Sequence, residues 1–127
     1  MRLLLDTHIL LWWVTDDAKL PTSAKAAIAD AASEVFVSAA TAWEIAIKQA
    51  IGKLEFPVAQ FPAILDQAGF TPLGIEVRHA VSAGALPPHH SDPFDRMLVA
   101  QAWHEGMTIV TVDPMIRLYG VAVLGDA

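Results

Sequence analysis

Four carboxylates stand where a strand is predicted to end or a helix to begin, an arrangement suited to holding a divalent cation. Asp6 follows the apolar run "RLLL", and Asp113 follows the β-branched run "TIVTV". Asp95 lies in the first turn of a helix predicted from Pro93, and Glu44 lies in the first half of the helix after "VFVS". Four acids brought to one place would repel one another strongly without a cation between them. Hard oxygen ligands of this kind favour Mg²⁺ or Mn²⁺ over Zn²⁺.

Convergence of the acids depends on the elements that carry them, which alternate between strand-like and helix-like runs. We expect strands at 2–5, 34–38, 71–75, 107–113 and 121–124. We expect helices at 7–14, 22–32, 39–54 (with a stop at Gly52), 58–68, 76–86 and 93–106, and a helical turn at 114–120. This order predicts a three-layer α/β/α domain with a central, mainly parallel sheet. In such a sheet the carboxyl ends of the strands and the starts of the following helices share one edge, where ligands bind.

Three of the acids also have a purely structural explanation. Asp6 and Asp113 are placed to cap the helices that follow them. Glu44 and Lys48 have the i, i+4 spacing of a surface ion pair. Taken singly, each of these acids is open to either interpretation.

The remaining acid is harder to explain as a cap. Asp92 is the expected N-cap of the helix from 93, so Asp95 is surplus to capping, although the positive helix end favours it. The four acids together are therefore stronger support for a metal site than any one of them alone. Together they favour a metal site, with Asp6 as a ligand.

The composition describes one domain, 1–127, with an acidic balance. Eight basic and fourteen acidic residues give a net charge of −6, which argues against binding nucleic acid through bulk positive charge. A nucleic-acid enzyme whose acids gather around cations is still allowed. Only 17% of residues are charged and 54% are hydrophobic, so we expect an apolar surface shared with a partner or a second copy. The absence of cysteine excludes disulfides and thiolate metal sites.

The same sequence predicts a cytoplasmic protein without a membrane segment. No stretch reaches the roughly 18 uninterrupted apolar residues of a membrane helix. Asp6, Thr7 and His8 interrupt the apolar N-terminus, which argues against a signal peptide.

Four stretches of the chain resemble a known family. "LLLDTH" at 3–8, Glu44 within "SAATAWEIAIK", "DPFDRMLVAQA" at 92–102 and "TIVTVD" at 108–113 resemble the PIN-domain ribonucleases. Among these the chain is most similar to the VapC-type toxins of bacterial type II toxin–antitoxin pairs. The similarity extends from residue 3 to about residue 124.

The resemblance implies a PIN-like fold and a Mg²⁺- or Mn²⁺-dependent endoribonuclease whose acidic cluster is Asp6, Glu44, Asp95 and Asp113. It implies that Asp6 and Asp95 bind metal directly, while Glu44 and Asp113 bind through water or hold a second ion. It also implies a homodimer, and a cognate antitoxin that blocks the active site. His8 and the extra Asp92 depart mildly from the family pattern, which leaves open whether Asp92 assists Asp95.

An RNA substrate would need contacts to its phosphates. Lys48, Lys53 and Arg96 are the candidates, although Lys48 and Arg96 can also pair with acids. Thr7 and Ser38 are candidates for hydrogen bonds to a carboxylate or to the attacking water, but we favour local capping for both.

Histidines and tryptophans lie near these segments. His89 and His90 either line the site, contact RNA or are solvated, and we favour solvation. Trp43 and Trp103 are expected in the core.

Other functions agree less well with the residues. A PIN-domain nuclease that processes RNA without being a toxin is the main alternative. A haloacid-dehalogenase-type phosphatase needs an aspartate two residues after the first, where this chain has His8. A receiver-like domain needs an acidic pair at the first strand end and a lysine after a late strand, and "TVDPMIRLYG" has no lysine. A binding protein that uses the acids only structurally is disfavoured by the intact set of four.

Overall fold

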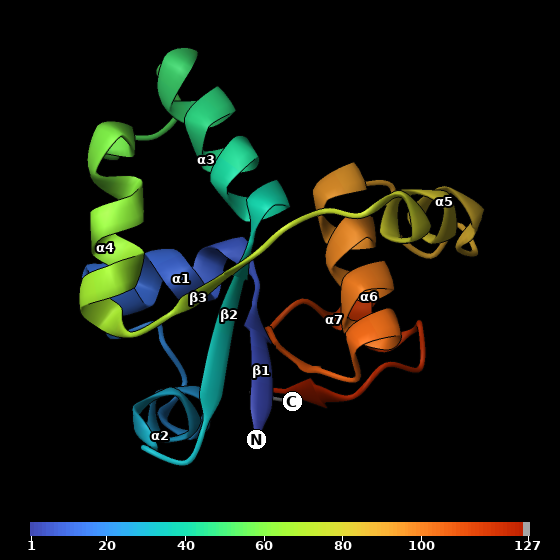
Figure 1. Ribbon diagram of the computed structural model, residues 1–127, viewed down its shortest axis with the longest axis horizontal. Helices are drawn as coiled ribbons and strands as arrows, with labels where there is room; N and C mark the ends of the chain where they lie inside the picture. Colours follow the sequence, from blue (N-terminus) through green and yellow to red (C-terminus); the bar gives the residue numbers. More distant parts are fainter. Residues whose placement is uncertain (126–127) are drawn as a thin grey trace.

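The computed structural model describes residues 1–125, in which five strands form one parallel sheet (Figure 1). The order across the sheet is β3-β2-β1-β4-β5, and all four pairings are parallel. This confirms the predicted α/β class, while residues 126–127 of the expected single domain, 1–127, lie outside the described part. The strands are β1 (Arg2–Leu5), β2 (Glu34–Ser38), β3 (Thr71–Leu73), β4 (Thr108–Val110) and β5 (Val123–Leu124).

Helices cover both faces of the sheet. In Figure 1, α1, α3 and α4 lie on one side of the strands, and α6 and α7 lie on the other. The helices are α1 (Thr7–Val14), α2 (Thr22–Ala29), α3 (Ala39–Ala50), α4 (Phe61–Ala68), α5 (Val77–Ala85), α6 (Pro93–Glu105) and α7 (Pro114–Arg117), with a 3₁₀ turn at Val58–Gln60.

Alternation along the strands divides the core between these two layers. Leu3 and Leu5 are fully buried in the cluster that includes α1, α2, α3 and α4. Leu4 points the other way, into the cluster formed with α6 and α7. Because successive strand side chains face opposite sides, a continuous apolar run such as 2–5 fits a strand covered on both faces.

Most predicted elements are confirmed, and the differences occur at their ends. The second helix ends at Ala29, because the side chain of Asp30 accepts the Ala32 N–H and turns the chain. The predicted helix at 58–68 begins as a separate 3₁₀ turn before α4. Strand β4 ends at Val110 rather than at the predicted residue 113.

The expectation that Trp43 and Trp103 lie in the core is wrong. Trp43 is 63% exposed and Trp103 is 70% exposed. Trp43 lies on α3, edge-on to Phe94 of α6 with ring centroids 5.5 Å apart. Both helices bury other faces against the sheet, so these two aromatic rings remain on the surface.

The last described residues fold back against the segment after β4. The backbone N–H of Thr111 donates to Leu124 O at 2.9 Å. Gly125 has a φ of 148°, and a Cβ built there would lie 2.1 Å from Thr111 O. Only glycine fits this approach, which keeps the C-terminal strand tight against Thr111.

Within residues 1–125, none of the helices combines the length and the apolar character needed to cross a membrane.

Candidate active site

The acids predicted from the sequence meet at the carboxyl edge of the sheet. β1 has β2 on one side and β4 on the other, so the strand order changes direction there. Open α/β sheets bind ligands at such a switch point. A pocket of about 240 Å³ opens at this edge, lined by Asp6, Thr7, His8, Glu44, Lys48, Asp92, Asp95, Val112, Asp113 and Pro114.

Asp6 caps a helix and faces the pocket at the same time. Its Oδ1 accepts the backbone N–H of Ile9 at 2.9 Å, which caps α1. Its Oδ2 accepts the hydroxyl of Thr111. Burial raises the pKa of Asp6 above its ordinary value, although both hydrogen bonds oppose the shift. A carboxylate has two oxygens, so capping and ligand binding are compatible at this residue.

Glu44 reaches the pocket from α3 on the other side. Its Oε1 accepts the hydroxyl of Thr7 at 2.5 Å, and its Oε2 lies 2.7 Å from Lys48 Nζ. The Glu44 side chain is only 6% exposed, whereas that of Lys48 is 41% exposed. The hydrogen bond to Glu44 is the main reason why the pKa of Lys48 is raised. The i, i+4 pair is therefore present, but its acid is buried in the pocket.

Asp92 and Asp95 divide two tasks at the start of α6. Asp92 Oδ1 accepts the N–H groups of Phe94 at 2.8 Å and Asp95 at 3.3 Å, so Asp92 is the cap. Asp95 is free of capping. Burial raises the pKa of Asp95 to about 7, and the charges of Asp92, Asp6 and Glu44 add to the shift.

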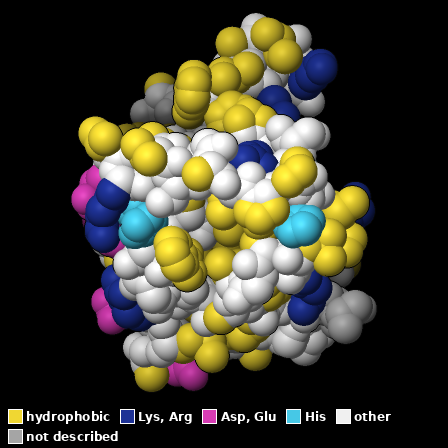
Figure 2. All heavy atoms as spheres, turned by 90° about the vertical axis from the view of Figure 1, so that its right-hand side faces the viewer, with side chains coloured by type: hydrophobic (Ala, Val, Ile, Leu, Met, Phe, Trp, Pro, Cys, Tyr) yellow, Lys and Arg dark blue, Asp and Glu magenta, His cyan; other side chains and the backbone are white. Residues whose placement is uncertain are grey.

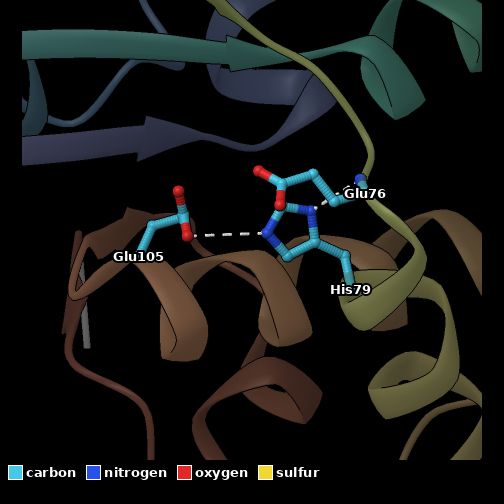
Figure 3. A group of neighbouring side chains, drawn as sticks. All are labelled: Glu76, His79 and Glu105. Atoms are coloured by element: carbon cyan, nitrogen blue, oxygen red, sulfur yellow. Dashed lines mark hydrogen bonds and ion pairs between the residues drawn. The ribbon is translucent and has the colours of Figure 1, made fainter.

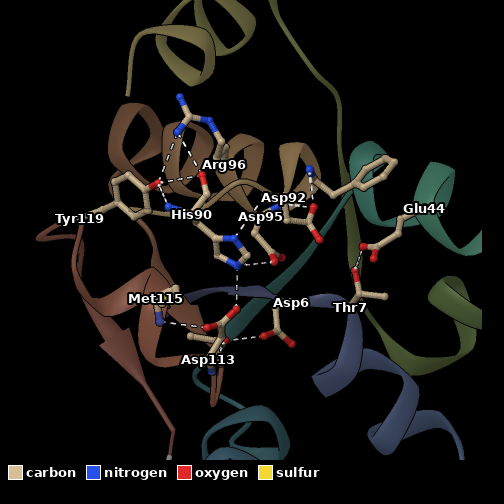
Figure 4. A network of polar contacts seen from close by, with 12 residues as sticks. Asp6, Thr7, Glu44, His90, Asp92, Asp95, Arg96, Asp113, Met115 and Tyr119 are labelled. Carbon is tan, nitrogen blue, oxygen red and sulfur yellow. Dashed lines mark hydrogen bonds and ion pairs between the residues drawn. The ribbon is translucent and has the colours of Figure 1, made fainter. Parts of the chain in front are cut away.

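His90 connects Asp95 to the fourth acid (Figure 4). Asp113 Oδ1 accepts the Met115 N–H at 2.9 Å and so caps α7. Its Oδ2 lies 2.9 Å from His90 Nε2, and the same nitrogen lies 3.0 Å from Asp95 Oδ2. Burial lowers the pKa of His90, but the hydrogen bond to Asp113 and the nearby carboxylate charges outweigh it, so the pKa is raised. The expectation that both loop histidines are solvated is wrong for His90.

The charge balance of the pocket suits a divalent cation. Five carboxylates line it, and Lys48 is the one Lys or Arg among the lining residues. That ammonium is already paired with Glu44. The raised pKa values of Asp6 and Asp95 reflect burial, to which neighbouring negative charge adds. Several carboxylate oxygens that are partly buried and lack a free Lys or Arg fit Mg²⁺ or Mn²⁺.

Comparison with known proteins identifies the family. The family model of the PIN domain matches residues 3–122. Ribonuclease VapC22 of Mycobacterium tuberculosis is 34% identical over 117 residues, which cover 90% of this chain and 88% of that protein. The chain is a PIN domain of the VapC ribonuclease family.

Solved structures of distant relatives share this PIN-domain fold. The structure of VapBC2 from Rickettsia felis, bound to a DNA fragment from its promoter, superposes with a TM-score of 0.69 at 14% identity over 98% of both chains. That of VapBC-1 from nontypeable Haemophilus influenzae has a TM-score of 0.67 at 17% identity, also over 98% of both chains.

The other predicted site residues of this PIN domain lie in varied surroundings. Thr7 and Lys48 line the pocket and contact Glu44, so the favoured local capping role is wrong for Thr7, whose hydroxyl donates to the Glu44 carboxylate. Ser38 is buried, caps α3 and donates its hydroxyl to Gln101 Oε1 at 2.6 Å. Lys53 is exposed beyond the end of α3.

Arg96 is bound to the backbone at the end of α5 and in the loop before α6. Its guanidinium donates to the phenol oxygen of Tyr119 and to five carbonyl oxygens, those of Ala83, Gly84, Leu86, Pro87 and His90. The structure thus places Arg96 where it holds this loop. Its assignment as a phosphate contact stays a prediction.

Two residues that contact the acids of the PIN-domain pocket were missed or undervalued from sequence. Thr111 stands two residues before Asp113, and side chains two apart on an extended segment face the same side, which is a usable signal. His90 stands two residues before the cap Asp92, in a loop whose course the sequence does not determine. Neither residue belongs to an acidic pattern.

Proposed function

We propose that this VapC-type PIN domain is a divalent-metal-dependent endoribonuclease. Mg²⁺ or Mn²⁺ would be held by Asp6, Glu44, Asp95 and Asp113, with Asp6 and Asp95 as the principal ligands. The observation that carries the proposal is the meeting of these four acids in one pocket whose only Lys or Arg is already paired. The relationship to a protein named as a ribonuclease supports RNA as the substrate.

The residues around the pocket would divide the work of phosphodiester hydrolysis. A bound divalent ion supplies an activated water and neutralises charge on the phosphate. Thr7 orients Glu44 by donating to its Oε1, and Thr111 orients Asp6 in the same way. Lys48 is exposed enough to meet an approaching phosphate while it remains paired with Glu44. A histidine base or a serine nucleophile is not needed.

Cleavage of RNA by the purified protein tests the proposal. We expect cleavage of a single-stranded RNA in Mg²⁺ or Mn²⁺, with none after chelation by EDTA and none by Asp6→Asn. The matched control is Asp66→Asn, because Asp66 is an exposed acid on α4. Cleavage that persists in EDTA or in Asp6→Asn would refute the metal mechanism.

We further propose that the chain is the toxin of a toxin–antitoxin pair, acts in the cytoplasm and forms a homodimer. An apolar groove of about 460 Å³ between α3, α4 and β3 would suit a protein partner. Hydrophobic side chains are also exposed in several places on the face in Figure 2, between scattered basic and histidine side chains. The structures in which the PIN fold recurs include one described as a toxin-antitoxin complex from Klebsiella pneumoniae.

Expression in a bacterial host distinguishes a toxin from an RNA-processing nuclease. A toxin arrests growth when expressed alone, and co-expression of a short neighbouring antitoxin gene restores growth. Normal growth with active, cleavage-competent protein would favour the RNA-processing alternative. Sedimentation of the purified chain measures whether it is a dimer.

A further inference from the structure

His90 lies between two of the acids that line the carboxylate pocket (Figure 4). Its Nε2 lies within hydrogen-bond distance of two of the proposed metal-binding side chains, 2.9 Å from Asp113 Oδ2 and 3.0 Å from Asp95 Oδ2. The side chain of His90 is 17% exposed. At this position His90 is either a metal ligand or a hydrogen-bond donor to the carboxylates. The two roles predict opposite effects of His90 on the affinity for the cation.

The other ring nitrogen decides between these roles. The backbone N–H of Asp92 points at His90 Nδ1, at a distance of 3.2 Å. Since a donor needs a lone pair to receive it, Nδ1 carries no proton, and the proton of the neutral ring is on Nε2. A histidine that binds metal through Nε2 has the reverse arrangement, with a proton on Nδ1 donated to an acceptor. His90 is therefore arranged as a hydrogen-bond donor to Asp113, with Asp95 Oδ2 in contact with the same nitrogen.

The backbone N–H and carbonyl oxygen of His90 are both hydrogen-bonded to other segments. The N–H of His90 donates to the Tyr119 hydroxyl at 2.8 Å. The carbonyl oxygen of His90 accepts from Arg96 at 3.3 Å. The loop therefore holds the ring against the carboxylates through contacts that do not involve the carboxylates themselves.

We propose that His90 is an internal competitor of the metal ion: its Nε2–H lies between Asp95 and Asp113, so a cation bound by both carboxylates must displace it from that position. His90 thus lowers the affinity for the cation while it stabilises the metal-free pocket. It is a positioning residue, because it acts through the carboxylates. The inference rests on the proposed function only in that a divalent cation binds these acids.

The variant His90→Asn isolates the Nε2 end of the ring. The asparagine side-chain oxygen can still accept the Asp92 N–H, but the shorter side chain cannot reach Asp95 or Asp113. Hydrogen bonds to charged groups correspond to roughly tenfold or more in an equilibrium constant. We expect His90→Asn to bind Mn²⁺ about tenfold more tightly by calorimetry at pH 8.5. We also expect a lower Tm without metal and a wild-type Tm at saturating Mn²⁺.

Weaker Mn²⁺ binding by His90→Asn would show that His90 is a ligand and would overturn the proposal. An unchanged Kd would overturn it as well, because there would be no competition. His90→Gln supplies an amide N–H near the position of Nε2, so it should return the Kd toward the wild-type value. If His90→Asn does not fold, a Kd for His90→Gln that is tighter or weaker than wild type by tenfold refutes the proposal.

His89→Asn is the matched control in the same loop. His89 is exposed and packs edge-on against Tyr119, with ring centroids 5.0 Å apart. It should leave the Mn²⁺ affinity unchanged. The calorimetry and Tm measurements contain no RNA, so they are independent of the cleavage assay that tests the proposed function. If the wild type cleaves RNA with metal but His90→Asn has an unaltered Kd for Mn²⁺, only the competitor role is refuted. Absence of metal binding by the wild type would refute the proposed function too.

Discussion

Two clusters among residues 1–125 each have a histidine facing two carboxylates, and only one of them has its acids in the pocket. In the second cluster His79 faces Glu105 and Glu76 between α5 and α6 (Figure 3). His79 Nδ1 accepts the Glu76 N–H at 3.0 Å, just as His90 Nδ1 accepts a backbone N–H. His79 Nε2 lies 3.6 Å from Glu105 Oε2.

The clusters differ in how their negative charge is balanced. Arg78 contacts both Glu76 and Glu105, so the second cluster already contains a permanent cation. The cluster around His90 has no Lys or Arg in contact with Asp95 or Asp113 among the described ion pairs. A histidine and two acids in proximity therefore do not define a metal site. Uncompensated charge in a pocket is the feature that separates the two.

The largest expected effect is on RNA cleavage. Asp95→Asn should lower the cleavage rate by about a hundredfold or more, because it removes a proposed metal ligand. Glu105→Gln, the equivalent change in the other cluster, should leave the rate unchanged. Initial rates on a fluorogenic RNA measure both. Equal losses in the two variants would remove the distinction between the clusters.

The pH dependence of stability should separate the clusters next. The pKa of Asp95, about 7, exceeds the ordinary value of 3.8, so the folded state binds an extra proton between these pH values. Stability from this group is present below pH 4 and is lost as pH rises to 7. We expect the Tm in EDTA to fall by about 5 °C more over this range in wild type than in Asp95→Asn.

Added Mg²⁺ or Mn²⁺ should restore the Tm of the wild type at pH 8, because the ion binds only the folded form. Glu105→Gln should keep the wild-type pH slope. A slope that disappears in Glu105→Gln but persists in Asp95→Asn would reverse the assignment of the two clusters.

A smaller effect is expected from a neighbour of the acids. Thr111→Val removes the hydroxyl that donates to Asp6 and accepts the Asp113 N–H. Partners that orient metal ligands typically contribute about tenfold in affinity, so the Mn²⁺ Kd should weaken about tenfold by calorimetry. Thr41→Val is the control, because Thr41 Oγ1 is buried without a hydrogen-bond partner among the described residues. An unchanged Kd in Thr111→Val would limit the site to its carboxylates.

Local patterns were sufficient for the scaffold and for the placement of the acids. Apolar runs, caps and prolines determine where β1 and α6 begin, and the parallel topology then brings Asp6 and Asp95 to one edge. The cap at Asp113 was also predictable, since the proline after it occupies the first position of α7.

The remainder depends on contacts between distant segments. The position of His90 follows from Arg96 and Tyr119, which hold the loop from outside it. The exposure of Trp43 depends on which face of α3 the sheet covers, and hydrophobicity alone predicts the opposite. Whether a histidine donates or accepts depends on one backbone N–H. The spacing of hydrophobic and polar residues in the sequence does not indicate whether a histidine nitrogen donates or accepts.

The central position of β1 also constrains when the enzyme can become active during synthesis. Asp6 precedes its partner Thr111 by 105 residues, and the fourth acid Asp113 also comes after β4. A nascent chain that stops before residue 113 lacks part of the set, whatever it has already folded. Under the proposed metal mechanism, such a truncated chain should therefore not cleave RNA.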